Sequence, residues 1–370
     1  MTRPRNWLLT TLFSAAALVS LAQAAVAPSP ALRERMRALT PAYGYHLVKT
    51  VPLGAPEEWD YLAFSPTTGR VFVAHGNRLT VVDAASGRVV GQVGPISGGP
   101  HGIAFDPAAG VGITDDGRLG QAVIFSLKTL KVLKRVPIER GADAVTFDAH
   151  SGHAFVIDGD TGTVAVIDPA RGRRVAYIHL GGDLEFAVPG DNGKLYVNGV
   201  SHREIFRIDT ATDRVDAKWP IPGCASPHGL AIDVETHRLF ATCENERMVI
   251  VSSNTGRVVA TVPIGRGTDA ARFDAERSLA FSANGFDGTL SVIHEAGPDR
   301  FVPVATVSTA LSARTMALDE QTGRIFVVAA HTTRAAMQRF MSEWRRTHHR
   351  PKGSPFTANS FELLMFDPGP

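Results

Sequence analysis

Short apolar segments alternate with polar turns along most of this chain. A typical unit opens with a strand such as "GIAFD", followed by a turn and a second strand such as "RVFVAHG". A third strand such as "LTVVD" comes next, then a turn rich in Thr, Gly and Arg, and a fourth strand such as "RVVATVPIG". Runs of four to eight apolar residues bounded by turn residues indicate β-strands. The pattern therefore predicts a chain built almost entirely from strands.

The four-strand unit recurs seven times. Its anchor is the last apolar residue of the first strand, and successive anchors are 41, 42, 41, 44, 41 and 45 residues apart. The anchors are Phe64, Phe105, Phe147, Val188, Ile232, Phe273 and Leu318. Four short strands in roughly 40–45 residues are typical of a β-propeller blade. The predicted fold class is all-β, a seven-bladed β-propeller with four-stranded antiparallel blades.

The seventh unit lacks its fourth strand, because the sequence stops shortly after "FELLMFD". A matching segment, "YHLVKTVPLG" at residues 45–54, stands near the other end and resembles "RVVATVPIG" of the fifth unit. A blade left with three strands would expose unpaired backbone groups. We therefore expect the N-terminal strand to complete the last blade and close the ring.

Three segments carry a family resemblance: "VVATVPIG", "TVVDAASGRVV" and "AVIDPARGRRV". They resemble the YVTN-repeat, YncE-like family of secreted seven-bladed β-propellers, and the resemblance extends over residues 45–370. It implies the fold but does not select an activity. Propellers serve as binding scaffolds, lactonases, dehydrogenases and electron-transfer subunits alike.

The first residues have the pattern of a secretory signal. Arg3 and Arg5 precede the apolar run "WLLTTLFSAAALVSLAQA", which ends in the small-residue motif Ala22-Gln23-Ala24. We expect a signal peptide at 1–24 with cleavage near Ala24, a linker at 25–44, and a periplasmic or secreted, monomeric protein. An uncleaved anchor helix is the alternative, although the run is shorter than the ~20 residues that span a membrane. No later segment is apolar enough to cross one.

Charge and cysteine content narrow the function classes. Removal of Arg3 and Arg5 leaves 36 basic and 36 acidic residues, so bulk charge does not favour nucleic-acid binding. Motifs of serine hydrolases, P-loop enzymes, zincins and covalently bound haem are absent. In an exported protein the two cysteines, Cys224 and Cys243, predict a disulfide. It would hold the loop that carries His228.

The segments "GPHGIAFD" and "SPHGLAID" place His101 and His228 at one position of the repeat. The other units also carry ionisable residues there, provided that the loop of the fourth unit is one residue shorter and presents Glu185 instead of Leu184. The resulting set is Asp60, His101, Asp143, Glu185, His228, Asp269 and Arg314. First strands are innermost in a propeller and begin at the face where ligands usually bind. The register therefore predicts a charged, ligand-binding ring at the channel mouth.

A second set of polar residues ends the second strands at the same face. It comprises His75, Asp116 (with Asp115 beside it), Asp158, Asn198, Glu244, Asn284 and His331. Oxygen and imidazole ligands suit calcium or zinc, and the metal candidates are His101, His228, Asp143 and Asp269. The two histidines are expected nearly opposite each other, too far apart to share one ion. The alternative is that these groups bridge neighbouring blades and cap turns without binding anything.

A long insertion, residues 332–360, interrupts the last unit. Met337, Phe340, Met341 and Trp344 recur at helical spacing, and the segment is rich in arginine. Connections between second and third strands emerge at the mouth face. We therefore expect a basic helical flap beside or over the channel.

These features favour an exported binding or scaffold protein that holds a small ligand or a protein partner at its charged mouth, and that is not an enzyme. The first alternative is a metal-dependent, lactonase-like hydrolase. An oxidoreductase-associated propeller and a nucleic-acid-binding propeller are further alternatives. The sequence lacks the haem motif that an oxidoreductase-associated propeller would carry, and the acidic ring argues against nucleic-acid binding.

Overall fold

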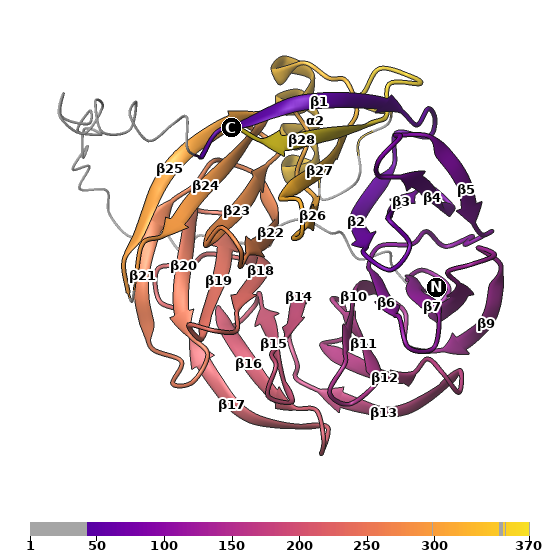
Figure 1. Ribbon diagram of the computed structural model, residues 1–370, viewed down its shortest axis with the longest axis vertical. Coiled ribbons are helices and arrows are strands. Elements are labelled where there is room, and N and C mark those ends of the chain that lie inside the picture. Colours follow the sequence, from indigo (N-terminus) through magenta and orange to yellow (C-terminus); the bar gives the residue numbers. More distant parts are fainter. Residues whose placement is uncertain (1–42, 298, 348–350, 352, 370) are drawn as a thin grey trace.

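Seven blades surround a central opening in the computed structural model, which describes residues 43–297, 299–347, 351 and 353–369 (Figure 1). Each blade is a sheet of four antiparallel strands, so the predicted fold is confirmed. The predicted signal peptide at 1–24 lies outside the described residues, as does all of the predicted linker at 25–44 except its last two residues.

The strands occupy four positions from the channel outward (Figure 1). The innermost strands are β2 (Trp59–Ser65), β6 (Ile103–Asp106), β10 (Ala142–Asp148), β14 (Leu184–Pro189), β18 (Pro227–Asp233), β22 (Thr268–Asp274) and β26 (Met316–Asp319). The second strands are β3 (Arg70–His75), β7 (Val111–Asp116), β11 (His153–Asp158), β15 (Lys194–Gly199), β19 (Arg238–Cys243), β23 (Leu279–Asn284) and β27 (Arg324–Ala329). The third strands are β4 (Arg78–Asp83), β8 (Gln121–Ser126), β12 (Thr163–Asp168), β16 (Glu204–Asp209), β20 (Arg247–Ser252), β24 (Thr289–Glu295) and β28 (Glu362–Pro368). The outermost are β5 (Val89–Val93), β9 (Val132–Pro137), β13 (Arg173–His179), β17 (Arg214–Pro220), β21 (Val258–Pro263), β25 (Phe301–Ser308) and β1 (Tyr45–Pro52).

The ring is closed by β1, which is the outermost strand of the blade formed by β26, β27 and β28. It pairs antiparallel with β28 from Tyr45, opposite Pro368, to Pro52, opposite Glu362. Tyr45 and Val51 are buried in this pairing. The N-terminal strand thus completes the last blade as the repeat predicts, and both ends of the ring are held in one sheet.

Aromatic side chains fill the space between blades. The third residue of six second strands is a buried aromatic, with at most 1% of its surface exposed: Phe72, Phe155, Tyr196, Phe240, Phe281 and Phe326. In the second blade Ile113 takes this position, and a ring from the third strand, Phe125, packs against Phe72 instead. Full burial of such a side chain contributes about 1.5–3 kcal/mol. This packing gives the inner strands a rigid frame.

Five innermost strands have a β-bulge close to their first residues. The pairing register shifts between Trp59 and Leu62, Ala142 and Ala144, Leu184 and Ala187, Pro227 and Leu230, and Thr268 and Ala270. An extra residue in a bulge leaves the ladder and re-aims its side chain. The residues inside these intervals include Asp60, Asp143, Glu185, His228 and Asp269. Bulges therefore direct the predicted ring residues.

The insertion of the last blade contains the helix α2 (Arg334–Thr347). In Figure 1 the helix overlies the last blade and leaves the central opening clear. Beyond it, Phe356 packs on Trp59 of β2 with 5.0 Å between the ring centroids. The insertion therefore reaches the blade that carries Asp60. Within the described ranges, no helix is both long enough and apolar enough to cross a membrane.

Removal of β1 tests the closure. Deleting residues up to 53 should lower the free energy of unfolding by at least about 3 kcal/mol, because the burial of Tyr45 and Val51 is lost. The open edge of β28 should also promote aggregation. Urea denaturation and light scattering measure the two effects. Deletion up to residue 42 is the control and should preserve both stability and monodispersity; a stable, monodisperse 54–370 fragment would contradict the closure.

Candidate functional site

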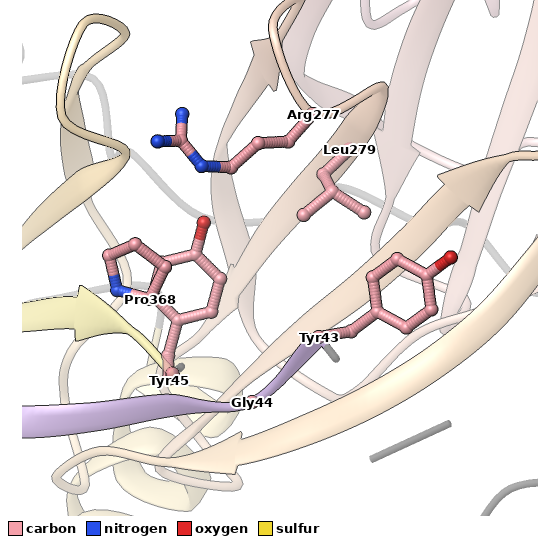
Figure 2. Close-up of a pocket in the computed structure, with 7 residues that line it drawn as sticks. Tyr43, Gly44, Tyr45, Arg277, Leu279 and Pro368 are labelled. Atoms are coloured by element: carbon pink, nitrogen blue, oxygen red, sulfur yellow. The ribbon is translucent and has the colours of Figure 1, made fainter. Parts of the chain in front are cut away.

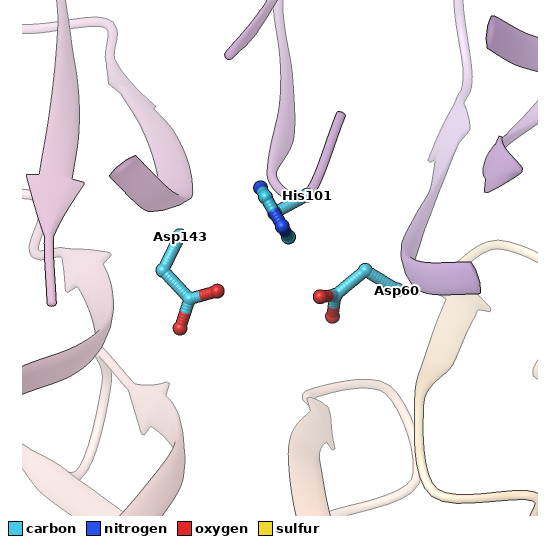
Figure 3. A group of neighbouring side chains, drawn as sticks. All are labelled: Asp60, His101 and Asp143. Carbon is cyan, nitrogen blue, oxygen red and sulfur yellow. The ribbon is translucent and has the colours of Figure 1, made fainter. Parts of the chain in front are cut away.

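Six of the seven residues of the predicted ring form two groups of three, and the seventh, Arg314, bonds to one of them. Asp60, His101 and Asp143 each offer a ligand atom, and these atoms lie within 4.8 Å of one another; we call them the first triad. Figure 3 shows the carboxylates of Asp60 and Asp143 facing the space next to the His101 ring. Glu185, His228 and Asp269 form the second triad by the same criterion. The two histidines belong to different groups. Glu185 faces the channel, whereas Leu184 is buried in the core.

The second triad has its own cations. His228 Nδ1 lies 3.5 Å from Glu185 Oε1 and 3.6 Å from Asp269 Oδ1, and its Nε2 lies 3.3 Å from Glu244 Oε1. Arg314 Nε donates to Asp269 Oδ2 over 2.6 Å. Burial opposes the imidazolium, but the three carboxylates outweigh it and raise the pKa of His228 well above its usual value. His228 and Arg314 in turn lower the pKa of Asp269 against the effect of burial.

The first triad is held differently. His101 Nδ1 lies 2.8 Å from Asp115 Oδ2, and Asp115 Oδ1 accepts from the backbone N–H groups of His101 and Gly102 at 3.1 and 2.8 Å. Asp115 is fully buried and makes all three contacts. Among the described residues, no donor forms a hydrogen bond with the side-chain carboxylate of Asp60 or Asp143. The imidazole of this triad is therefore positioned, while its two carboxylates lack partners.

Titration behaviour follows from this difference. Burial raises the pKa of Asp60 to about 7, although His101 and Arg314 act in the opposite direction. Burial also raises the pKa of Asp143 well above its usual value, and the nearby charges of Glu185 and Asp60 add to the shift. Asp115 and Asp60 overcome the burial of His101 and raise its pKa to about 9. Asp143 and Asp60 therefore hold their protons more tightly than ordinary aspartates do, beside a His101 that favours its cationic form.

Tyr61 and Phe186 fill the channel next to the ring. Tyr61 Oη donates to Glu185 Oε1 over 3.3 Å and lies 3.4 Å from the backbone oxygen of Asp269, so one side chain of the first blade reaches the fourth and sixth. Its ring packs on Phe186 at 5.0 Å, and the Arg272 guanidinium lies 5.2 Å from the Phe186 centroid. Tyr61 is only 3% exposed. Tyr61 and Phe186 therefore occupy the channel next to the charged residues.

Sequence reasoning missed these channel side chains and also the role of Asp115. The innermost strands carry Tyr61, Phe186 and Arg272 at positions where the repeat mostly has small or aliphatic residues. These three large side chains were the feature of the sequence that could have indicated their role. Asp115 and Asp116 are adjacent, and neighbouring strand residues point to opposite sides of the sheet. The structure shows that Asp115 contacts the ring residue His101, whereas Asp116 faces Arg135 at 3.9 Å.

Two residues of the second predicted set support His228. Glu244 contacts its ring directly, and Asn198 Nδ2 donates to its backbone oxygen over 2.8 Å. The remaining five residues make contacts elsewhere. His75 bonds Thr80 and Pro56, Asp116 faces Arg135, Asp158 caps a turn through Thr161, Asn284 donates to Ser291, and His331 contacts Glu362. These five side chains make contacts outside the two triads.

The predicted disulfide between Cys224 and Cys243 is present. It joins the loop before β18 to the end of β19, and Glu244 N donates to Ala225 O over 3.0 Å beside it. His228 and Glu244, which contact each other, are therefore attached to the two ends of one covalent link. A crosslink that closes a loop of this length stabilises by about 3 kcal/mol in the chain-entropy model.

A separate cleft lies beside the closing strand, lined by Tyr43, Tyr45, Arg277, Leu279 and Pro368 (Figure 2). Its one cation already has partners. Arg277 Nη1 lies 3.0 Å from Asp274 Oδ2, and Nη2 donates to the backbone oxygen of Thr322 over 3.1 Å. The arginine thus joins the sixth and seventh blades. The cleft has none of the unpartnered carboxylates that distinguish the first triad.

Comparison with known proteins supports the fold and goes no further. No family model and no curated protein matches the sequence. Among solved structures, hydrazine synthase from Kuenenia stuttgartiensis superimposes with a TM-score of 0.63 at 15% sequence identity, over 77% of this chain and 94% of that chain. Matching chains number 1853, so the architecture is widespread. A likeness at this identity shows a shared propeller and leaves the function to the site.

The pH dependence of stability tests whether His75 has a structural role as a buried, neutral histidine. Its ring is buried, and burial together with Arg78 lowers its pKa to about 4. The unfolded chain takes up a proton near pH 6.5. The contribution of His75 to the free energy of unfolding should therefore fall as the pH drops from 6.5 toward 4, by about 2 kcal/mol between pH 7 and pH 5 relative to a chain without this histidine. Urea denaturation at the two pH values measures the loss.

The same loss should be absent in His75→Asn, whatever the absolute stability of that variant. Exposed His179, changed to Asn, is the matched control and should keep the full pH dependence. An unchanged pH dependence in His75→Asn would show that the ring is not held in its neutral form.

Proposed function

We propose that this chain is an exported propeller of the YVTN-repeat, YncE-like type that binds a small, positively charged ligand at its channel mouth. The repeat segments and the signal-like N-terminus support the family and the export. The observation that carries the binding role is a surplus of acid at the mouth. Six carboxylates face three cationic groups: Asp60, Asp115, Asp143, Glu185, Asp269 and Glu244 against His101, His228 and Arg314.

The shape of the site favours binding of a ligand at the mouth over its passage through the channel. Tyr61 crosses the channel from the first blade to Glu185 of the fourth and packs on Phe186, which narrows the passage next to the charged residues. Side chains of the ring keep partial exposure, 27% for His101 and 16% for Asp269, which gives water and solutes access. Acidic groups between low-dielectric walls concentrate a field that attracts cations. A partly exposed group of acidic side chains at the channel mouth is suited to binding a metal ion or a small organic cation.

A metal-dependent, lactonase-like hydrolase is the second candidate. Each triad combines one imidazole with two carboxylates, and catalytic metal sites commonly use three protein ligands and keep a position open. The scaffold role ranks first because the acids beside the triads, Asp115 and Glu244, are already paired with His101 and His228. Hydrolysis of a lactone series with added Zn²⁺ tests the second candidate: turnover that disappears in Asp143→Asn would favour the hydrolase over the binding protein.

The binding role is tested on the exported chain, purified without an affinity tag. Isothermal titration with Zn²⁺, Ca²⁺, spermidine and a lysine-rich peptide should show saturable binding of at least one of them. Asp143→Asn should weaken that binding at least about tenfold, which corresponds to about 1.4 kcal/mol. The reason is that the substitution removes one of the ligand groups that converge with Asp60 and His101.

The matched control is Asp216→Asn, on the outer strand β17, where the carboxylate pairs with Lys194 and Arg207. It should leave the affinity for the same cation unchanged. The proposal fails if all four probes give no heat of binding, or if both substitutions weaken binding equally.

A further inference from the structure

We propose that the first triad is a site for one divalent transition-metal ion, with Zn²⁺ as the test case, and that the second triad is a structural ion-pair network. The inference rests on the proposed function, since it names the cation that the mouth holds. It also assigns unequal roles to two groups with the same composition of one histidine and two carboxylates.

The donor set of the first triad is suitable for such an ion. Asp60, His101 and Asp143 each contribute one atom, and these atoms lie within 4.8 Å of one another, so small side-chain movements bring them around a single ion. Carboxylates alone suit calcium and magnesium, whereas an added imidazole suits zinc and its neighbours. Three protein ligands leave room for water or for a group of a bound molecule.

The contact between His101 and Asp115 is the second observation. In protein metal sites, a coordinating histidine usually donates its other ring N–H to a carboxylate, which fixes the tautomer and the ring orientation. His101 Nδ1 makes this bond to Asp115 Oδ2 at 2.8 Å. Asp115 is itself held by the backbone N–H groups of His101 and Gly102. The Nε2 atom is left as the coordinating nitrogen, and no described residue forms a hydrogen bond with it.

The state of Asp143 is the third observation. Its side chain is 6% exposed and points toward Asp60 and His101 (Figure 3), and the described residues offer it no hydrogen-bond donor. A buried carboxylate without a partner is costly, and the cost is removed when a cation binds. Asp60 lacks a donor for its carboxylate in the same way. Two unpartnered carboxylates and one oriented imidazole therefore converge on the same space.

The second triad shows the opposite arrangement. Arg314 donates to Asp269 over 2.6 Å, Tyr61 donates to Glu185 over 3.3 Å, and His228 lies between three carboxylates. Each carboxylate there already faces a cation or a hydroxyl group. A metal ion would have to displace Arg314 and Tyr61, whereas in the first triad it displaces no protein group. This difference assigns the ion to the first triad.

The test uses the exported, tag-free chain, stripped with a chelator and titrated with Zn²⁺, followed by elemental analysis after dialysis. One Zn²⁺ per chain is expected. Asp143→Asn and His101→Asn should each weaken binding at least about 100-fold, since loss of an outer partner alone typically costs 10- to 100-fold. Glu185→Gln in the second triad should weaken it less than about threefold, through the reduced field.

Visible absorption of the Co²⁺-loaded chain supplies a readout that general destabilisation does not change. Its bands should shift in His101→Asn and stay in place in Glu185→Gln. Thermal unfolding without metal checks the fold, and Asp143→Asn should remain folded because asparagine has the same size and removes a buried carboxyl group to which the described residues offer no hydrogen-bond donor. If His101→Asn does not fold, Asp143→Asn still decides the assignment.

The outcomes separate this inference from the proposed function. Equal losses in Glu185→Gln and Asp143→Asn, or a ratio of Zn²⁺ to chain well below one, would overturn the metal assignment. If spermidine or the basic peptide then still binds and depends on Asp143, the cation-binding role stands. If none of the probes binds, both proposals fail.

Discussion

Every charged group at the mouth depends on one constraint: seven innermost strands must begin around a common axis. The pairing of β1 with β28 imposes it, because that sheet holds both ends of the ring together. Residues at one position of the repeat are then gathered around one opening, however far apart they are in the sequence. The bulges at the start of five inner strands complete the effect by turning a side chain out of each ladder.

Carboxylates gathered in this way repel one another. Among its described residues, the chain supplies hydrogen-bond donors to the carboxylates of the second triad and none to those of the first. Arg314, Tyr61 and the disulfide-linked loop neutralise or hold the second triad. On the other side, the fully buried Asp115 orients His101 but adds a further negative charge. Folding alone would favour compensation of both sides. The unequal treatment of two similar triads is the physical reason to assign them different roles.

The sequence predicts the scaffold well because strand length, turn residues and anchor spacing are local and repeated. The closing strand is also predictable, because "YHLVKTVPLG" matches the strand that the last blade lacks. The identity of the mouth residues is predictable wherever the repeat register is clear, as at His101 and His228. At Glu185 the register needed a shorter loop, whereas in the structure Pro189 rather than Val188 pairs with the second residue of β15, the place that the anchors take in the other blades.

Other features depend on information that the sequence does not hold. Asp115 and Asp116 are both buried acids that point to opposite sides of one sheet, and the sequence does not tell which of the two contacts His101. His75 ends its strand as predicted, but Phe361 packs against its imidazole and the backbone oxygen of Pro56 accepts a hydrogen bond from its Nε2, contacts that need the closed propeller. Tyr61 of the first blade donates a hydrogen bond to Glu185 of the fourth, and no pattern within one repeat indicates such a partner.

The most direct measurement is the anomalous X-ray scattering of a crystal grown from the tag-free chain with equimolar zinc. Our account predicts a single strong peak bounded by the carboxylates of Asp60 and Asp143 and by Nε2 of His101, with Arg314 still bonded to Asp269. A peak between Glu185, His228 and Asp269, or a first triad in which the two carboxylates bond to each other with no metal density, would contradict it.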